Sequence, residues 1–220
     1  MFATLIEKLH RRQDLSVDEA AAVMGEIMAG RATPAQIAGL LIALSMKGER
    51  PSEIVGLAMT MRANAVKLSK PYDGLFDTCG TGGDGASTFN VSSLAALVLS
   101  GCGIRVAKHG NRSMTSKSGS ADVLTALGVD ITLPPEKVSE CIKNIGIGFM
   151  FAPSLHPAMK YAMGARKALG TRTVFNILGP LCNPAGVDRQ LMGIFEGSLT
   201  NKVAKVLQKL GSTHAMVAHG

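Results

Sequence analysis

The first part of the chain carries its apolar side chains at helical spacing. Ile37, Leu40, Leu41 and Leu44 recur at i, i+3, i+4 and i+7, the pattern of one buried helix face. Start and stop signals divide this part into four expected helices: an N-terminal one, then residues 16–29, 33–48 and 51–66. No strand pattern interrupts them. The sequence therefore predicts a small helical bundle over residues 1–69.

After residue 69 short apolar runs alternate with helical stretches. Strands are expected over residues 75–78, 104–107, 148–151, 191–195 and 215–218, and helices over 92–100, 121–127, 135–144, 157–169 and 200–210. This alternation, with glycine loops at strand ends, predicts an α/β domain with a mainly parallel sheet over residues 70–220. We expect helix 157–169 to return to the helical bundle. Ligands of such sheets bind at the carboxyl ends of the strands.

Composition narrows the possible classes of protein. The 220 residues are 46% hydrophobic, which excludes a disordered chain, and their net charge of +7 suits an anionic partner. The basic residues are dispersed and aromatic residues make up 4% of the chain, so a nucleic-acid surface is disfavoured. We therefore expect a small phosphorylated ligand.

The cysteines and the apolar runs indicate a compartment. Cys79, Cys102, Cys141 and Cys182 form no CxxC pair and have no histidine at metal-ligand spacing, which disfavours a zinc site. Scattered cysteines in a chain of this size are typical of reduced thiols in a cytoplasmic protein. No signal-peptide core opens the chain, and no apolar run approaches the length of a membrane span, so no membrane partner is expected.

Two loops are candidates for phosphate binding. The first, residues 77–85, has the sequence DTCGTGGDG and lies between a strand and a helix that begins near Asn90. It matches a dinucleotide fingerprint formally, but no acidic residue ends the next strand, and Asp84 would repel a pyrophosphate. A cradle of backbone N–H groups explains it better than a bare glycine turn.

The second loop, residues 108–122, concentrates cations and hydroxyls after the next expected strand. Lys108 and Arg112 are expected counter-charges to phosphate, with the serine and threonine hydroxyls as donors. A solvated polar loop is the alternative. No GxxxxGK[ST] motif occurs, which excludes a loop of the nucleoside-triphosphatase type.

A third region, residues 151–184, contains a His156-Pro157 turn, Arg166 on an expected helix, and the turn pairs Gly179-Pro180 and Asn183-Pro184. Together the three regions carry GTGGD, FN-x-S, KHGNR, SGS-x-D, HPAMK and FN-x-LGPL-x-NP in order. With these motifs and their spacing, essentially the whole chain resembles the anthranilate phosphoribosyltransferase family. The resemblance implies a fold like that of nucleoside phosphorylases and phosphoribosyltransferases.

The resemblance also implies a reaction and its substrate-binding residues. The family transfers the phosphoribosyl group of phosphoribosyl pyrophosphate (PRPP) to the amine of anthranilate and releases pyrophosphate, in tryptophan biosynthesis. The positions that match the family's PRPP site are Gly80, Gly83, Asp84, Thr88, Asn90, Val91, Ser92, Ser93, Lys108, His109, Gly110, Asn111, Arg112, Ser113, Met114, Thr115, Ser116 and Ser120.

Anthranilate, magnesium and a second copy of the chain are the other partners that the resemblance implies. Gly80, Asn111 and Arg166 match anthranilate contacts, with His109 and Gly179-Pro180 nearby, and Ser92 matches a Mg²⁺ ligand. The family implies a cytoplasmic homodimer. We assign no residue as a catalytic acid or base, because the aryl amine is already nucleophilic and the enzyme mainly positions two substrates.

One departure from the family concerns the end of the chain. In the family the last strand runs into an Asp-Gly-Leu-Asp-Glu type segment with acidic Mg²⁺ ligands, whereas this sequence stops at Gly220. The expectation is a C-terminally incomplete α/β domain with negligible activity by itself. Two rival functions remain open: a pyrimidine-nucleoside-phosphorylase-like enzyme, and a non-catalytic relative that binds nucleic acid.

Overall fold

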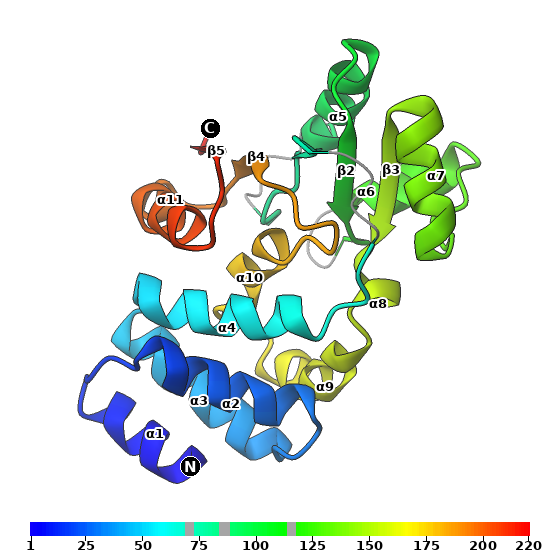
Figure 1. Cartoon of the computed structure of the whole chain (residues 1–220). Helices are drawn as coiled ribbons and strands as arrows, with labels where there is room; N and C mark the ends of the chain where they lie inside the picture. The colour runs from blue at the N-terminus through cyan, green and yellow to red at the C-terminus, as the bar shows by residue number, and fades with distance from the viewer. Residues whose placement is uncertain (69–72, 84–88, 114–117) are drawn as a thin grey trace. The chain divides into compact units, whose positions relative to one another are not determined.

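The computed structural model describes residues 1–68, 73–83, 89–113 and 118–220, and it divides into two compact units (Figure 1). The first unit comprises Met1–Ala65 and His156–Cys182, and the second comprises Val66–Leu155 and Asn183–Gly220. The expected fold class is confirmed, since helices make up the N-terminal part and a parallel sheet with helices follows. No helix of the described ranges combines the length and the apolar character needed to cross a membrane.

The first unit is helical. Its elements are α1 (Phe2–His10), α2 (Val17–Met28), α3 (Pro34–Lys47), α4 (Pro51–Ala63), the 3-10 turn η1 (Pro157–Met159), α9 (Lys160–Leu169) and α10 (Phe175–Leu181). The helices α2 and α3 begin where the sequence predicts, and each opens with a capping box: the Ser16 and Thr33 hydroxyls accept from the third backbone N–H of their helices. α2 packs on α4, α1 on α3, and α9 on both α2 and α3. The core between them is aliphatic and includes Leu9, Met24, Ile37 and Ile54.

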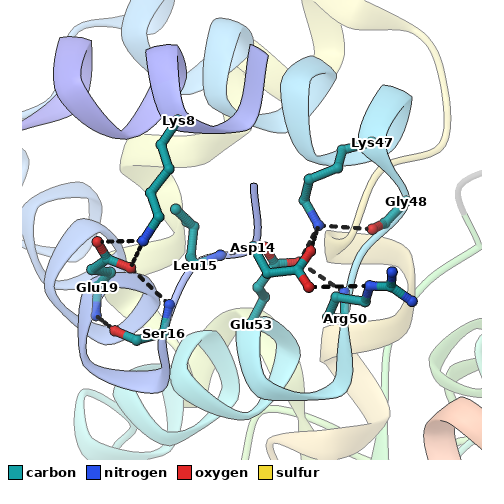
Figure 2. Close-up of polar contacts among 9 residues, drawn as sticks. All are labelled: Lys8, Asp14, Leu15, Ser16, Glu19, Lys47, Gly48, Arg50 and Glu53. Carbon is teal, nitrogen blue, oxygen red and sulfur yellow. Dashed lines mark hydrogen bonds and ion pairs between the residues drawn. The ribbon is translucent and has the colours of Figure 1, made fainter. Parts of the chain in front are cut away.

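A buried carboxylate, Glu53, ties three helix ends together in this unit (Figure 2). Its Oε1 accepts from the backbone N–H of Leu15 at 2.8 Å. Its Oε2 accepts from Arg50 N at 2.7 Å and from Lys47 Nζ at 3.1 Å, while Lys47 Nζ also donates to Asp14 Oδ1 at 2.8 Å. These contacts join the segment before α2, the end of α3 and the start of α4.

The second unit is built on a parallel sheet. Its elements are β1 (Phe76–Asp77), α5 (Val91–Gly101), β2 (Val106–Gly110), α6 (Ser120–Ala126), α7 (Pro135–Ile145), β3 (Ile147–Phe151), α8 (Ala152–Leu155), β4 (Arg189–Gly193), the 3-10 turn η2 (Gly197–Leu199), α11 (Thr200–Lys209) and β5 (His214–Ala218). The strand order is β3-β2-β1-β4-β5, and every pairing is parallel. The order reverses at β1 and β4, which is where ligands of such sheets bind.

Helices and aliphatic side chains support this sheet. α7 packs on β3, α11 packs on β5, and α5 contacts both β2 and β3, which Figure 1 shows side by side. The buried cluster includes Leu75, Ala107, Ile142, Met150 and Val187. The side chains of this cluster are aliphatic, as expected from an aromatic-poor composition.

Several elements differ from the expectation by one to three residues, and three differences concern the site or the core. β2 extends to Gly110 instead of ending at residue 107, because the polar Lys108 and His109 are buried within it. β4 lies two residues earlier than expected, at Arg189–Gly193. Gly179-Pro180 was expected as a turn, but it lies inside α10, where the buried Pro180 packs in the core.

Candidate functional site

The glycine loop after β1 lies at the point where the strand order reverses. Thr81 N donates to Gly193 O at 2.9 Å, and a Cβ on Gly80 would approach the same oxygen to 3.0 Å. Gly82 and Gly83 adopt φ values of +62° and +73°. Alanine tolerates such positive φ values poorly. The loop is thus held against the end of β4.

Hydroxyl groups at the start of α5 lie beside the end of β1. Thr78 Oγ1 donates to Ser92 O at 2.7 Å, and Ser93 Oγ donates to Asn90 Oδ1 at 2.8 Å. Asn90 is the residue before the first turn of α5, and Val91 in that turn is exposed. Backbone N–H groups at a helix start, together with hydroxyls, are suitable donors for phosphate oxygens.

Lys108 brings a positive charge to these hydroxyls from within the sheet. Its side chain is buried, and Nζ donates to Ser92 Oγ at 3.2 Å and to Thr78 Oγ1 at 3.4 Å. The expectation that Lys108, His109 and Gly110 belong to a loop is wrong, since all three are in β2. Position in a strand fixes the ammonium more firmly than a loop would, because the strand is hydrogen-bonded along its length.

Asp77, the last residue of β1, is fully buried beneath these loops. Its Oδ1 accepts from His109 N at 3.1 Å and its Oδ2 accepts from Asn183 Nδ2 at 2.8 Å. Burial raises the pKa of Asp77 to about 6, against the opposing influence of the Lys108 charge and of these hydrogen bonds. The sequence motifs predicted no role for Asp77, although an acidic residue at the end of an apolar strand is a signal that could have indicated one.

A second carboxylate, Asp122, joins two parts of the second loop, residues 112–113 and Gly119. Its Oδ2 accepts from Ser113 N at 3.0 Å and from Gly119 N at 2.8 Å, and its Oδ1 accepts from Arg112 Nη1 at 2.9 Å. The backbone donors and Arg112 lower the pKa of Asp122. A Cβ on Gly119 would lie 2.7 Å from Asn111 O, so only glycine permits this close approach.

All thirteen expected PRPP residues of the described ranges belong to the second unit and lie at or after the carboxyl ends of β1 and β2. They are Gly80, Gly83, Asn90, Val91, Ser92, Ser93, Lys108, His109, Gly110, Asn111, Arg112, Ser113 and Ser120. Ser120 Oγ donates to Asn111 O at 3.4 Å and so belongs to the same loop closure. Asp84, Thr88, Met114, Thr115 and Ser116 lie outside the described residues.

Arg166 lies on α9 in the first unit. It is half-buried, its guanidinium stands 5.0 Å from the centroid of the Phe175 ring, and Nη1 lies 3.8 Å from Met163 Sδ. Burial lowers the pKa of Arg166. Across the described ranges no carboxylate pairs with it. A half-buried guanidinium of this kind suits a carboxylate ligand.

Ser92 alone does not make a magnesium site. Mg²⁺ requires about six oxygen ligands, usually with one or two carboxylates among them. The described part of the chain contains no group of three or more His, Cys, Asp or Glu residues that could hold a metal. The Ser92 hydroxyl also faces the Lys108 ammonium, which opposes a second cation there. The described residues therefore fit an anion better than a free metal ion.

Family models and known proteins match this arrangement. Residues 3–65 match the model "Glycosyl transferase family, helical bundle domain", and residues 72–220 match "Glycosyl transferase family, a/b domain". An anthranilate phosphoribosyltransferase of Thermoanaerobacter sp. is 54% identical over 220 residues, covering 100% of this chain and 65% of its own length. The chain thus spans about two thirds or slightly less of the curated relatives that it matches.

Solved structures agree with the sequence relatives. The anthranilate phosphoribosyltransferase of Thermus thermophilus matches with a TM-score of 0.93 at 48% identity, over 98% of this chain and 65% of that one. The Saccharomyces cerevisiae enzyme in complex with PRPP and Mg matches with a TM-score of 0.89 at 28% identity, over 98% of this chain and 64% of that one. The resemblance read from the motifs is confirmed.

Proposed function

Because the chain belongs to the glycosyl transferase family, we propose that it transfers the phosphoribosyl group of PRPP to the amine of anthranilate. The observation that carries this proposal is the geometry after β1. A left-handed glycine loop, the start of α5 and the buried Lys108 ammonium converge at the strand-order reversal. Together they offer N–H, hydroxyl and ammonium donors to phosphate oxygens. Anthranilate is proposed as the acceptor because the similar proteins are anthranilate phosphoribosyltransferases.

The proposed reaction requires mainly that the two substrates are held together and that the charge on the leaving pyrophosphate is stabilised. The anthranilate nitrogen attacks the anomeric carbon, the bond from that carbon to the pyrophosphate oxygen breaks, and the amine proton passes to water. Positive charge develops on the ribose ring and negative charge on the departing pyrophosphate. Lys108 and the glycine-loop N–H groups are the proposed partners of the departing oxygens. Holding the amine near the anomeric carbon supplies the remaining acceleration.

Anthranilate recognition is proposed for Gly80, Asn111 and Arg166. Arg166 would bind the carboxylate bidentately, since no carboxylate of the described chain pairs with it. Asn111 is exposed, with its backbone held by α6 and its side-chain amide in the loop after β2. Arg166→Lys should raise the KM for anthranilate and leave the affinity for PRPP unchanged, because a lysine cannot form the bidentate pair.

Magnesium is proposed to enter with PRPP. The yeast relative is recorded in complex with PRPP and Mg. Ser92 would contribute one oxygen ligand, and the phosphates would contribute others. When bound, Mg²⁺ neutralises charge on the pyrophosphate leaving group.

A cytoplasmic homodimer completes the proposal. All four cysteines lie within the described residues and none is in a disulfide, which suits a reducing compartment. α1 and α3 enclose a groove of about 420 Å³ whose lining includes Ile6, Leu9, Ile42, Ala43 and Met46. An apolar groove between two surface helices suits the same groove of a second copy.

Anthranilate fluorescence tests the activity. We would measure its PRPP-dependent loss with the 220-residue chain, and with a chimera in which the rest of the Thermoanaerobacter relative follows residue 220. Turnover in the chimera that disappears in Lys108→Ala would support the proposal. Phosphate-dependent cleavage of thymidine in its place would favour the nucleoside phosphorylase alternative. A salt-dependent gel shift with DNA and no turnover would favour the nucleic-acid-binding one.

A further inference from the structure

The buried Asp77 carboxylate contacts both strands that lead into the two candidate phosphate loops. Asp77 ends β1, and the next residue, Thr78, begins the glycine loop. On β2, Asp77 accepts a hydrogen bond from the backbone N–H of His109, the residue that follows Lys108. One side chain thus contacts the strands that precede both loops. The Asp77 side chain is 0% exposed, so it is not part of the surface that either loop presents to a ligand.

Asn183 extends these contacts to a third segment. Its Nδ2 donates both to Asp77 Oδ2 at 2.8 Å and to Ala107 O at 2.9 Å, and its Oδ1 accepts from Ala185 N at 2.9 Å. We call the Asp77 carboxylate, the His109 N–H and the Asn183 side chain the Asp77 brace. It joins β1, β2 and the turn that leads to β4, and these are the segments that frame the glycine loop.

Only a carboxylate satisfies this set of donors. His109 N–H and the Asn183 amide both point hydrogens at Asp77, one at each oxygen. An asparagine at position 77 would turn an NH₂ group toward one of them and leave a buried donor unsatisfied. Within the described ranges no ion pair closer than 4 Å involves Asp77, so its charge is buried without a contacting cation.

A buried charge without a contacting cation is costly for the folded state. The raised pKa of Asp77 reflects that cost. Glu53, the other fully buried carboxylate of the described residues, differs in having Lys47 Nζ at 3.1 Å. A costly charge beside a ligand-binding loop is more typical of a functional role than of a role in stability.

We propose that Asp77 is a positioning residue of the PRPP site, whose brace sets the relative placement of Lys108 and the glycine loop. The inference rests on the proposed function, since PRPP is the ligand concerned. Asp77 acts through the residues it holds: β2 keeps Lys108 Nζ at the hydroxyls of Thr78 and Ser92 only while the ends of β1 and β2 stay in register.

Asp77→Asn and Glu53→Gln form a matched pair for the test. Both neutralise a fully buried carboxylate, one in each compact unit. Two quantities are measured on the whole 220-residue chain: amide hydrogen exchange residue by residue, and the affinity for PRPP with Mg²⁺ by NMR titration into the millimolar range. Asp77→Asn should speed exchange at His109 and Ala185 and weaken PRPP binding by about tenfold, as expected when one buried charge-assisted contact is lost.

Glu53→Gln should speed exchange at Leu15 and Arg50 and leave PRPP affinity unchanged. Should Asp77→Asn fail to fold, Asn183→Ser keeps the carboxylate, removes the amide donor, and should weaken PRPP binding in the same direction. Unchanged PRPP affinity in a folded Asp77→Asn chain would overturn the inference. Equal losses in Asp77→Asn and Glu53→Gln would also overturn it, because the effect would then follow stability. A wild-type chain without PRPP affinity would instead overturn the proposed function.

Discussion

At the residue scale, two glycine conformations and one buried acid define the phosphate site. Gly82 and Gly83 have positive φ, a backbone conformation that other residues adopt only at an energetic cost. Asp77 carries its charge in the core beneath them. Neither feature belongs to the aliphatic cluster that supports the sheet.

Gly83→Ala should raise the KM for PRPP more than the KM for anthranilate. At φ +73° an alanine costs about 1 kcal/mol, which shifts the loop toward other conformations. The measurement is steady-state kinetics of the chimera with each substrate varied in turn. Gly128→Ala is the control, since Gly128 has φ +83° outside the loops and should affect stability alone. Equal rises in both KM values would contradict the assignment.

The charge of Asp77 should give stability a measurable pH dependence. The folded-state pKa of about 6 exceeds the ordinary value of 3.8, so the folded chain binds more protons between these values. The contribution of Asp77 to the free energy of unfolding therefore falls as pH rises from about 4 to 7, by about 3 kcal/mol. Urea unfolding of wild type and Asp77→Asn across that range measures it, because other titrations cancel in the difference. A difference independent of pH would show that Asp77 has an ordinary pKa.

At the element scale, helix ends in the first unit depend on one polar network. Glu53 binds backbone N–H groups before α2 and α4 and the ammonium at the end of α3 (Figure 2). The side chains of Lys47 and Glu53 are only 4% and 0% exposed, so the pair is shielded from solvent. Such a pair is weak evidence of net stabilisation, but without Glu53 the buried Lys47 ammonium would keep only the half-exposed Asp14 as a carboxylate partner.

Glu53→Gln should lower the free energy of unfolding by about 3 kcal/mol, because it removes the buried charge that faces the Lys47 ammonium and turns an amide NH₂ toward one of the buried donors. Urea denaturation followed by circular dichroism measures this loss. Glu7→Gln serves as the comparison, since its ion pair with Arg11 is exposed and its loss should change little. If the two variants were equally stable, Glu53 would have no special part in joining the helix ends.

At the scale of the whole molecule, the proposed homodimer can be tested through its surface. Sedimentation equilibrium should give about twice the chain mass of 22.9 kDa. Met46→Glu should produce a monomer, because Met46 lines the α1–α3 groove and is 75% exposed in the single chain. Met59→Glu is the control, as this methionine on α4 is 50% exposed and lies outside the groove lining. A wild-type monomer, or dissociation by both variants, would contradict the proposed interface.

The sequence by itself determined the elements and the phosphate chemistry. Capping boxes, Pro34 and the apolar stripe are local signals, so α2 and α3 begin where they were expected. The glycine loop and the basic segment after β2 were recognisable because glycines and cations in those orders serve few purposes other than anion binding.

The tertiary structure decided what depends on distant contacts. Lys108 and His109 entered β2, and Pro180 entered α10, because burial outweighed the local polar and turn signals. Asp77 gained significance only when β1, β2 and Asn183, more than a hundred residues along the chain, came within hydrogen-bond distance. Local patterns specify which segments form helices and strands, since those hydrogen bonds are short-range. Which buried polar groups meet is set by the packing of the sheet, and no local pattern encodes it.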